Sequence, residues 1–89
     1  MGQQDGKLES NVPGADRTPS FGEKVAGVSF NPGGLPLVDS IKSKFAKIID
    51  ELNDERKLVV GDAARYYSKA ISHAEDAQMN AVKSATWKD

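Results

Sequence analysis

Two stretches in the second half of the chain have apolar residues at every third or fourth position. The first begins at Pro36, and its stripe comprises Leu37, Val38, Ile41, Phe45, Ile48, Ile49 and Leu52. The second contains no glycine or proline, and its seam comprises Ala64, Tyr67, Ile71, Ala74, Gln78, Ala81 and Ala85. Because this spacing places side chains on one face of an α-helix, it predicts helices over about 36–56 and 62–86.

The residues at the helix ends support this interpretation. Pro36 suits a first helical turn, and Asp39 places negative charge near the positive end of the helix dipole. Gly61 and Asp62 predict a break followed by an N-cap. We therefore expect an all-α fold, namely an antiparallel two-helix hairpin preceded by an irregular N-terminal arm.

The first 36 residues interrupt every periodic pattern, because they contain all four prolines and all but one of the eight glycines. Residues 1–20 have too few apolar side chains to offset the entropy of ordering, so we expect a disordered tail there. The hairpin domain is expected over residues 21–89.

Residues 21–34 of the arm have a pattern of their own. Phe21, Val25, Val28 and Phe30 recur at intervals of two to four positions, which predicts that they are buried. Alternation over residues 28–30 is typical of a short extended segment, and the Asn-Pro-Gly-Gly that follows predicts a turn.

Composition limits the classes of function. The chain has 89 residues with 38% apolar and 28% charged side chains, which is one small domain at most. It has no cysteine and one histidine, His73, so disulfides, zinc-cysteine sites and hydrolytic triads are not expected. Because it has no nucleophile with a nearby base, we expect neither an enzyme nor a cofactor.

The charge balance and hydropathy indicate which partners to expect. Twelve basic and thirteen acidic residues give a net charge of −1, which argues against a nucleic-acid polymer as partner. No apolar run is long enough to cross a membrane, so no membrane partner is expected and the protein is expected to be soluble. Two helices cover only one side of each other, and a lone hairpin should be marginally stable. We therefore expect an oligomer in which hairpins share cores.

The turn before the first long helix is the first candidate for chemistry. Phe30 can stack on a planar base, and the glycines beside Asn31, including Gly33, expose N–H groups near a helix start, which suits phosphate. The alternative is a connecting loop with Phe30 as a core anchor. Lys42 can reach back toward this loop and bind phosphate as a point charge. The alternative for Lys42 is a solvated helix face.

Two further residues each have two possible roles. Arg65, next to Tyr66, can bind a phosphate and a base, or it can pair with Asp62 or with another chain. Trp87 can fill an oligomer contact or stack on a ligand. The sequence does not decide between these roles.

Four segments resemble a known family in their order and spacing: FNPGG at 30–34, Ile41-Lys42, FAKIIDELN at 45–53 and AQMNAVKSATW at 77–87. They are similar to the phage anti-CBASS cyclic-nucleotide sponges, whose helical hairpin is shared with the Thoeris anti-defence sponges. The similarity covers residues 21–87. It implies a phage-encoded protein in the cytoplasm of the infected bacterium that sequesters cyclic di- or trinucleotide immune messengers without cleaving them, so that the CBASS effector is not activated.

The resemblance also implies an assembly and a set of site residues. Members of the family are compact homohexamers with dinucleotide pockets between protomers. Lys42 corresponds to the family's phosphate-binding lysine, and Phe30 is the nearest counterpart of its base-stacking aromatic residue, which is a tyrosine in other members. The arginine of a trinucleotide pocket in some members falls on Ile71, with Arg65 upstream.

The candidate ligand-binding residues are therefore Phe30, Asn31, Gly33, Lys42 and Arg65. The alternative hypothesis from a different class is a phage structural or adaptor hairpin, or an inhibitor that docks on a host protein. The helices alone fit either hypothesis.

Overall fold

A computed structural model describes residues 18–31 and 33–88, and every regular element within these ranges is a helix. The elements are α1 (Phe21–Ala26), α2 (Pro36–Arg56) and α3 (Gly61–Ala85). The prediction of an all-α fold is therefore confirmed for the described residues. The predicted tail lies outside them except for residues 18–20, and so does Pro32 of the predicted turn.

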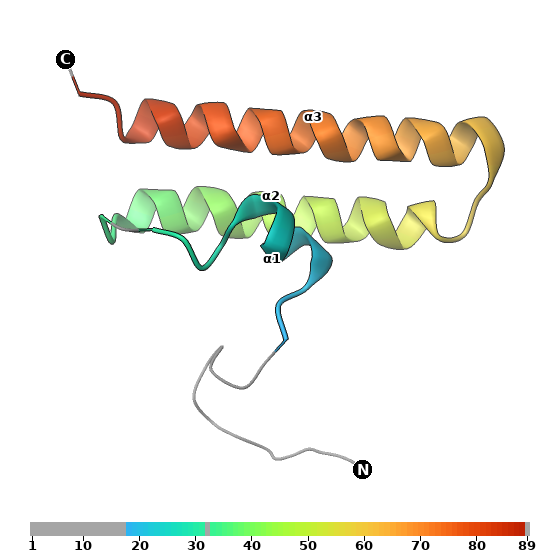
Figure 1. Ribbon diagram of the computed structural model, residues 1–89, viewed down its shortest axis with the longest axis horizontal. Coiled ribbons are helices and arrows are strands. Elements are labelled where there is room, and N and C mark those ends of the chain that lie inside the picture. The colour runs from blue at the N-terminus through green and yellow to red at the C-terminus, as the bar shows by residue number, and fades with distance from the viewer. Residues whose placement is uncertain (1–17, 32, 89) are drawn as a thin grey trace, which may run out of the picture.

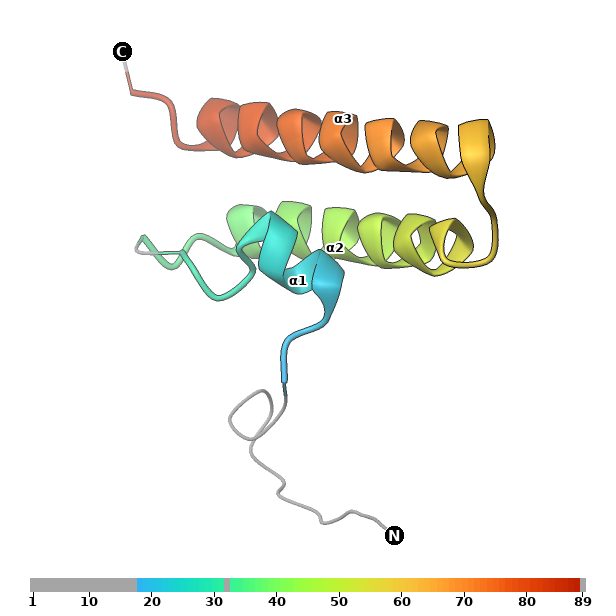
Figure 2. The same cartoon turned by 45° about the vertical axis from the view of Figure 1, so that its right-hand side comes forward.

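The two long helices lie side by side and run in opposite directions, joined by residues 57–60 (Figure 1). The same arrangement is visible after a 45° turn (Figure 2). Their small core contains Val38, Ala46 and Ile49 of α2 and Ile71 of α3, and Ile49 is the only described side chain that is completely buried. Much of the apolar surface of the pair therefore remains exposed.

The start of α3 differs from the prediction. The helix begins at Gly61, one residue early, and its N-cap is Val60, whose side chain forms no capping hydrogen bond. Asp62 is therefore not the N-cap. It lies in the first turn, where acidic charge is favourable, and its carboxylate pairs with Arg65 at 3.2 Å.

The arm contains a helix where an irregular segment was predicted. The Oγ atom of Ser20 accepts from the Glu23 N–H at 3.1 Å, and the Glu23 carboxylate accepts from the Ser20 N–H at 2.8 Å. This capping box begins α1, and Gly27 ends it with a left-handed φ of 67°. The prediction was wrong because these short-range signals outweigh the frequent glycines.

Helix α1 packs closely on α2 through a glycine and a carboxylate. A Cβ atom on Gly22 would lie only 2.0 Å from the carbonyl oxygen of Ala46, so only glycine allows this approach. The Asp50 carboxylate accepts from the Gly22 N–H at 2.6 Å and from the Ser20 hydroxyl at 2.7 Å. Asp50 thus fixes the start of α1 to the middle of α2.

The predicted burial of the large apolar residues of the arm is wrong for Phe21 and Phe30, which are exposed, whereas Val25 and Val28 are half-buried. Gly22 and Ala26 are its buried residues, because only small side chains fit between α1 and α2. Phe30 is 69% exposed. Residues 27–29 form a turn in place of the predicted extended segment, and the Phe30 N–H donates to the Gly27 carbonyl at 2.9 Å.

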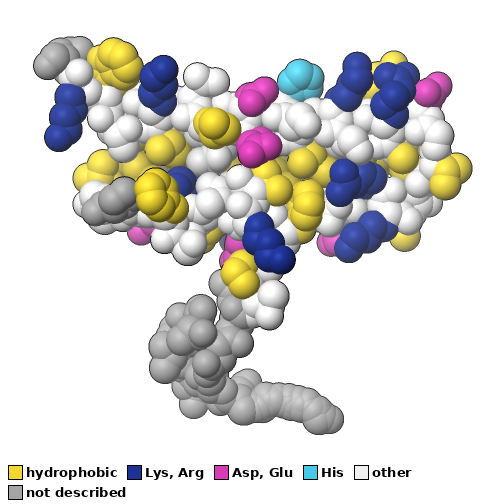
Figure 3. Space-filling model, in the orientation of Figure 1, with side chains coloured by type: hydrophobic (Ala, Val, Ile, Leu, Met, Phe, Trp, Pro, Cys, Tyr) yellow, Lys and Arg dark blue, Asp and Glu magenta, His cyan; other side chains and the backbone are white. Residues whose placement is uncertain are grey.

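Helix α1 covers only part of the junction between α2 and α3. Figure 3 shows hydrophobic side chains along this junction on both sides of α1. The exposed large apolar residues of the molecule include Leu37, Ile48, Leu58, Val60, Tyr66, Met79 and Trp87. Among the described residues, no helix combines the length and the hydropathy needed to span a membrane.

Candidate functional site

Lys42 lies in the second turn of α2, and it is only 6% exposed. Its ammonium group donates to the Gly27 carbonyl at 3.0 Å and to the Phe30 carbonyl. The side chain therefore reaches back to the loop after α1, and it holds that loop against α2. Since an ammonium group has three N–H donors, one donor of Lys42 is not used by any described residue.

The charge of Lys42 has no opposite charge beside it among the residues that the structure describes. Within residues 18–31 and 33–88, no carboxylate forms an ion pair with its ammonium group. Its partners are two neutral carbonyls and the Phe30 ring, whose centroid lies 5.3 Å from Nζ. Buried charges are normally paired, because removing an ion from water is costly. The surroundings of Lys42 therefore favour the binding of an anion.

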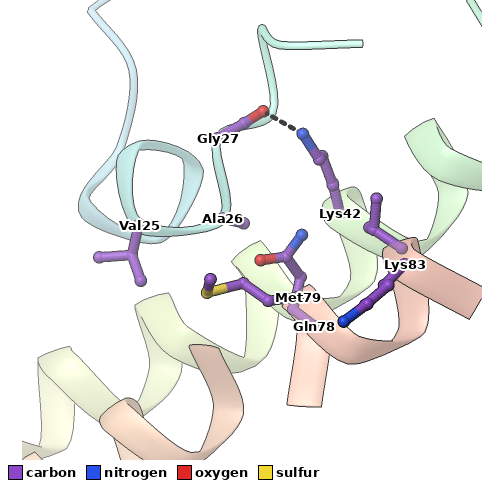
Figure 4. Close-up of a pocket in the computed structure, with 8 residues that line it drawn as sticks. Val25, Ala26, Gly27, Lys42, Gln78, Met79 and Lys83 are labelled. Atoms are coloured by element: carbon purple, nitrogen blue, oxygen red, sulfur yellow. Dashed lines mark hydrogen bonds between the residues drawn. The ribbon is translucent and has the colours of Figure 1, made fainter. Parts of the chain in front are cut away.

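Lys42 lines a cleft of about 350 Å³ where the arm, α2 and α3 meet (Figure 4). The other lining residues are Val25, Ala26, Gly27, Gln78, Met79, Val82 and Lys83. Small-molecule pockets have volumes of about 300–1,000 Å³ and combine apolar walls with a few polar groups. This cleft has that composition, and its volume is near the lower end of that range.

Phe30 and Lys42 are brought together by the fold. The Phe30 carbonyl accepts from Lys42, and the ring lies beside the same ammonium group. Because the ring is mostly exposed, it is not the core anchor that the sequence left open as its alternative role. An exposed ring next to a buried cation can stack on a base whose phosphate contacts the cation.

Asn31 and Gly33 shape the loop and do not line the cleft. The Asn31 amide donates to the Leu35 carbonyl and to the Asp39 carboxylate, both at 2.9 Å, which ties the loop to the start of α2. Gly33 is exposed, and the positive φ of this turn belongs to Gly34. The structure therefore gives these two residues an indirect part in the site.

Arg65 lies apart from the other candidates, near the start of α3 at the connection end of the helix pair. Its guanidinium pairs with the Asp62 carboxylate at 3.2 Å and lies 4.5 Å from the centroid of the Tyr66 ring. The side chain of Arg65 is 50% exposed. Ile71, where the family's second-helix arginine falls, is buried in the core.

Trp87 follows the end of α3 and is largely exposed. The Lys83 ammonium group lies 5.9 Å from the centroid of its ring. Lys83 also lines the Lys42 cleft, so it adds a second positive charge at that end of the molecule.

Gln78 lines the same cleft and was not among the predicted site residues. It is 3% exposed. A signal for it was present, because Gln78 is the only amide in a seam otherwise made of alanine, isoleucine and tyrosine. A polar side chain at a position predicted to be buried needs a hydrogen-bond partner, and it is therefore a candidate for function.

Comparisons of this chain with protein-family models, with curated proteins and with solved structures found no match. Its function has to be inferred from its own residues, above all from Lys42 and the cleft that this side chain lines.

Proposed function

We propose that this protein binds a cyclic di- or oligonucleotide second messenger and withholds it, uncleaved, from a CBASS effector. The observation that supports this best is the buried ammonium group of Lys42, which lines a cleft and forms no ion pair with a carboxylate in the described part of the chain. A phosphodiester supplies the missing negative charge and accepts the third N–H in a charge-assisted hydrogen bond. Phe30 adds stacking of about 1–3 kcal/mol per base.

One copy of the chain provides half of the proposed site. A cyclic dinucleotide has two phosphates and two bases, whereas the cleft, at about 350 Å³, is near the lower limit for a single small ligand. Two copies related by a two-fold axis present Lys42 and Phe30 twice to one ring. We therefore place the complete site between protomers of a homohexamer.

The exposed apolar surface supports an oligomer of helical hairpins. At the connection end, an apolar groove of about 330 Å³ is lined by Leu52, Ala63, Tyr66, Tyr67 and Ala70. We assign this groove to contact with a second copy, because the core of one copy is very small. Sedimentation is expected to show an oligomer at micromolar concentration, and a folded monomer would contradict this assignment.

Sequestration requires stoichiometric binding and release of the intact ligand. We place this activity in the cytoplasm of a bacterium infected by the phage that encodes the protein. Chromatography of the ligand after the complex is denatured is expected to recover the unchanged ring. Recovery of a linear product would instead indicate a phosphodiesterase.

The direct test is calorimetry of the full chain with a panel of cyclic di- and trinucleotides. We expect at least one ring to bind at micromolar affinity or better, and Lys42→Met to weaken it at least about tenfold, because a charged hydrogen bond is lost. Lys47→Met is the matched control, since Lys47 is an exposed lysine of the same helix. Lys42→Arg keeps the charge and is expected to bind more tightly than Lys42→Met.

Equal affinities of Lys42→Met and Lys47→Met would overturn the role of Lys42. A thermal-shift panel tests the alternative function, an adaptor hairpin or inhibitor of a host protein. A protein saturated at 100 times its dissociation constant gains about 2.7 kcal/mol of stability. A protein whose stability does not increase with any cyclic nucleotide fits the adaptor hypothesis.

A further inference from the structure

The side-chain amide of Gln78 is buried and has no hydrogen-bond partner among the described residues. The residue is 3% exposed, and its amide forms no hydrogen bond with any residue in the described part of the chain. Nearly all buried amides have a partner, because an unpaired polar group in a protein interior costs free energy. The other buried amide of the helix pair, Asn53, illustrates the rule, since it accepts from Arg56.

The position of Gln78 relates it to the cleft. Figure 4 shows its amide turned toward α1 and toward the side of Lys42, with Met79 and Lys83 on the same helix. Gln78 and Lys42 come from different helices and line the same cleft, so one ligand can contact both. The neighbouring walls contributed by Val25 and Val82 are apolar and suit the face of a base.

We propose that Gln78 recognises the edge of a base in this cleft and favours adenine over guanine. The inference deepens the proposed function and rests on it, because it assigns a base preference to the site whose phosphate contact is Lys42. A carboxamide presents one donor and one acceptor side by side. The N7 edge of adenine offers the matching pair, an acceptor at N7 and a donor at N6.

Guanine does not match the amide at this edge. Its N7 and O6 atoms are both acceptors, so the carbonyl oxygen of Gln78 faces another acceptor. One bidentate contact of this kind discriminates between bases by about 1–3 kcal/mol, which is roughly 5- to 150-fold in affinity. The amide of Gln78, which bonds to no described residue in the free protein, gains two hydrogen bonds when adenine binds.

The test is calorimetry of the full chain with cyclic di-adenylate and cyclic di-guanylate. We expect the wild type to bind di-adenylate at least about tenfold more tightly than di-guanylate. Gln78→Met keeps the length of the side chain and removes the amide. The affinity of this variant is expected to fall at least about tenfold for di-adenylate and less than about threefold for di-guanylate. Asn80→Met is the matched control, because the Asn80 amide is exposed and bonds to its own helix at the Asp76 carbonyl.

The melting temperature of the free protein separates recognition from a structural role. Because no described residue uses the amide, Gln78→Met is expected to melt at the wild-type temperature or above it. A melting temperature lower by more than about 5 °C, together with equal losses of affinity for the two cyclic dinucleotides, would show a structural role and overturn the inference. Gln78→Leu gives the same comparison if the Met variant does not fold.

The remaining outcomes separate this inference from the proposed function. The role of Gln78 is overturned if the wild type binds both rings equally or if Gln78→Met keeps the preference for adenine. Neither outcome contradicts the proposed sequestration of the ligand. A wild type that binds no cyclic nucleotide overturns both.

Discussion

Lys42 and Arg65 lie near the starts of α2 and α3, at opposite ends of the antiparallel pair, and their surroundings differ. Arg65 is half exposed and paired with Asp62, and such surface pairs contribute about 0–1 kcal/mol. Lys42 is buried among neutral carbonyls, where removal of the charge from water is costly. Of the two cations, Lys42 is therefore the one whose charge is not balanced by a described residue. An anionic ligand is expected to bind most favourably at the end of the helix pair that the N-terminal arm covers, which we call the arm end.

The two ends also differ in how they are built. At the arm end, α1 packs on α2, and the loop that follows α1 supplies the two carbonyls that hold the Lys42 ammonium group. At the connection end, no third helix of the described residues packs on α2 and α3, and large side chains such as Leu58 and Val60 are exposed. A change that moves α1 away from α2 is therefore expected to affect stability and binding together, whereas a change of Arg65 itself should affect neither strongly.

Gly22→Ala is expected to have the largest effect. The new Cβ atom would lie 2.0 Å from the Ala46 carbonyl oxygen, so α1 has to move away from α2 at a cost of about 2 kcal/mol. Urea denaturation measures the loss. Gly33→Ala is the control, because its Cβ atom meets nothing closer than 3.7 Å, and it should change stability by less than about 0.5 kcal/mol. Equal stabilities of the two variants would contradict the close packing of α1.

Phe30→Leu is expected to have an intermediate effect, confined to the ligand. The ring is mostly exposed, so its loss should change the free energy of unfolding by less than about 0.5 kcal/mol. Loss of base stacking should weaken cyclic-dinucleotide binding by about 1 kcal/mol, or roughly fivefold, in calorimetry. A variant that binds as tightly as the wild type would remove Phe30 from the site.

Arg65→Met is expected to have the smallest effect. It removes an exposed ion pair and an exposed cation–π contact, each of which contributes about 1 kcal/mol or less. Ligand affinity should change by less than about twofold, because Arg65 lies away from the cleft. A loss as large as that expected for Lys42→Met would mean that the assembly brings Arg65 of another copy into the site, and it would remove the contrast between the two ends.

Local patterns predicted the long helices well. The spacing of apolar residues and Pro36 placed α2 over 36–56, and α3 differs from its predicted range by one residue at each end. The N-cap of α3 was mistaken, since the helix begins at Gly61 and Asp62 therefore lies within its first turn, where it pairs with Arg65. Helix α1 was missed although the capping box of Ser20 and Glu23 was visible in the sequence.

The candidate site was predictable only in part. The spacing between the loop and α2 indicated that Lys42 can reach back, and it contacts the Gly27 and Phe30 carbonyls. The burial of Lys42 and Gln78 was not predictable, because it depends on how α1 docks on the helix pair. That docking is set by a contact between Gly22 and Ala46, which are distant in the sequence and carry no periodic signal.

The central claim is that the buried ammonium group of Lys42 contacts the phosphate of a bound cyclic dinucleotide. The most direct measurement is NMR of the full chain with ¹⁵N-labelled lysine side chains, with the Lys42 signal assigned by its absence in Lys42→Met. At saturation with the ring that binds most tightly, we predict a large shift of the Lys42 ammonium resonance, while the exposed Lys47 stays unchanged. An unchanged Lys42 resonance in the saturated protein would contradict the claim.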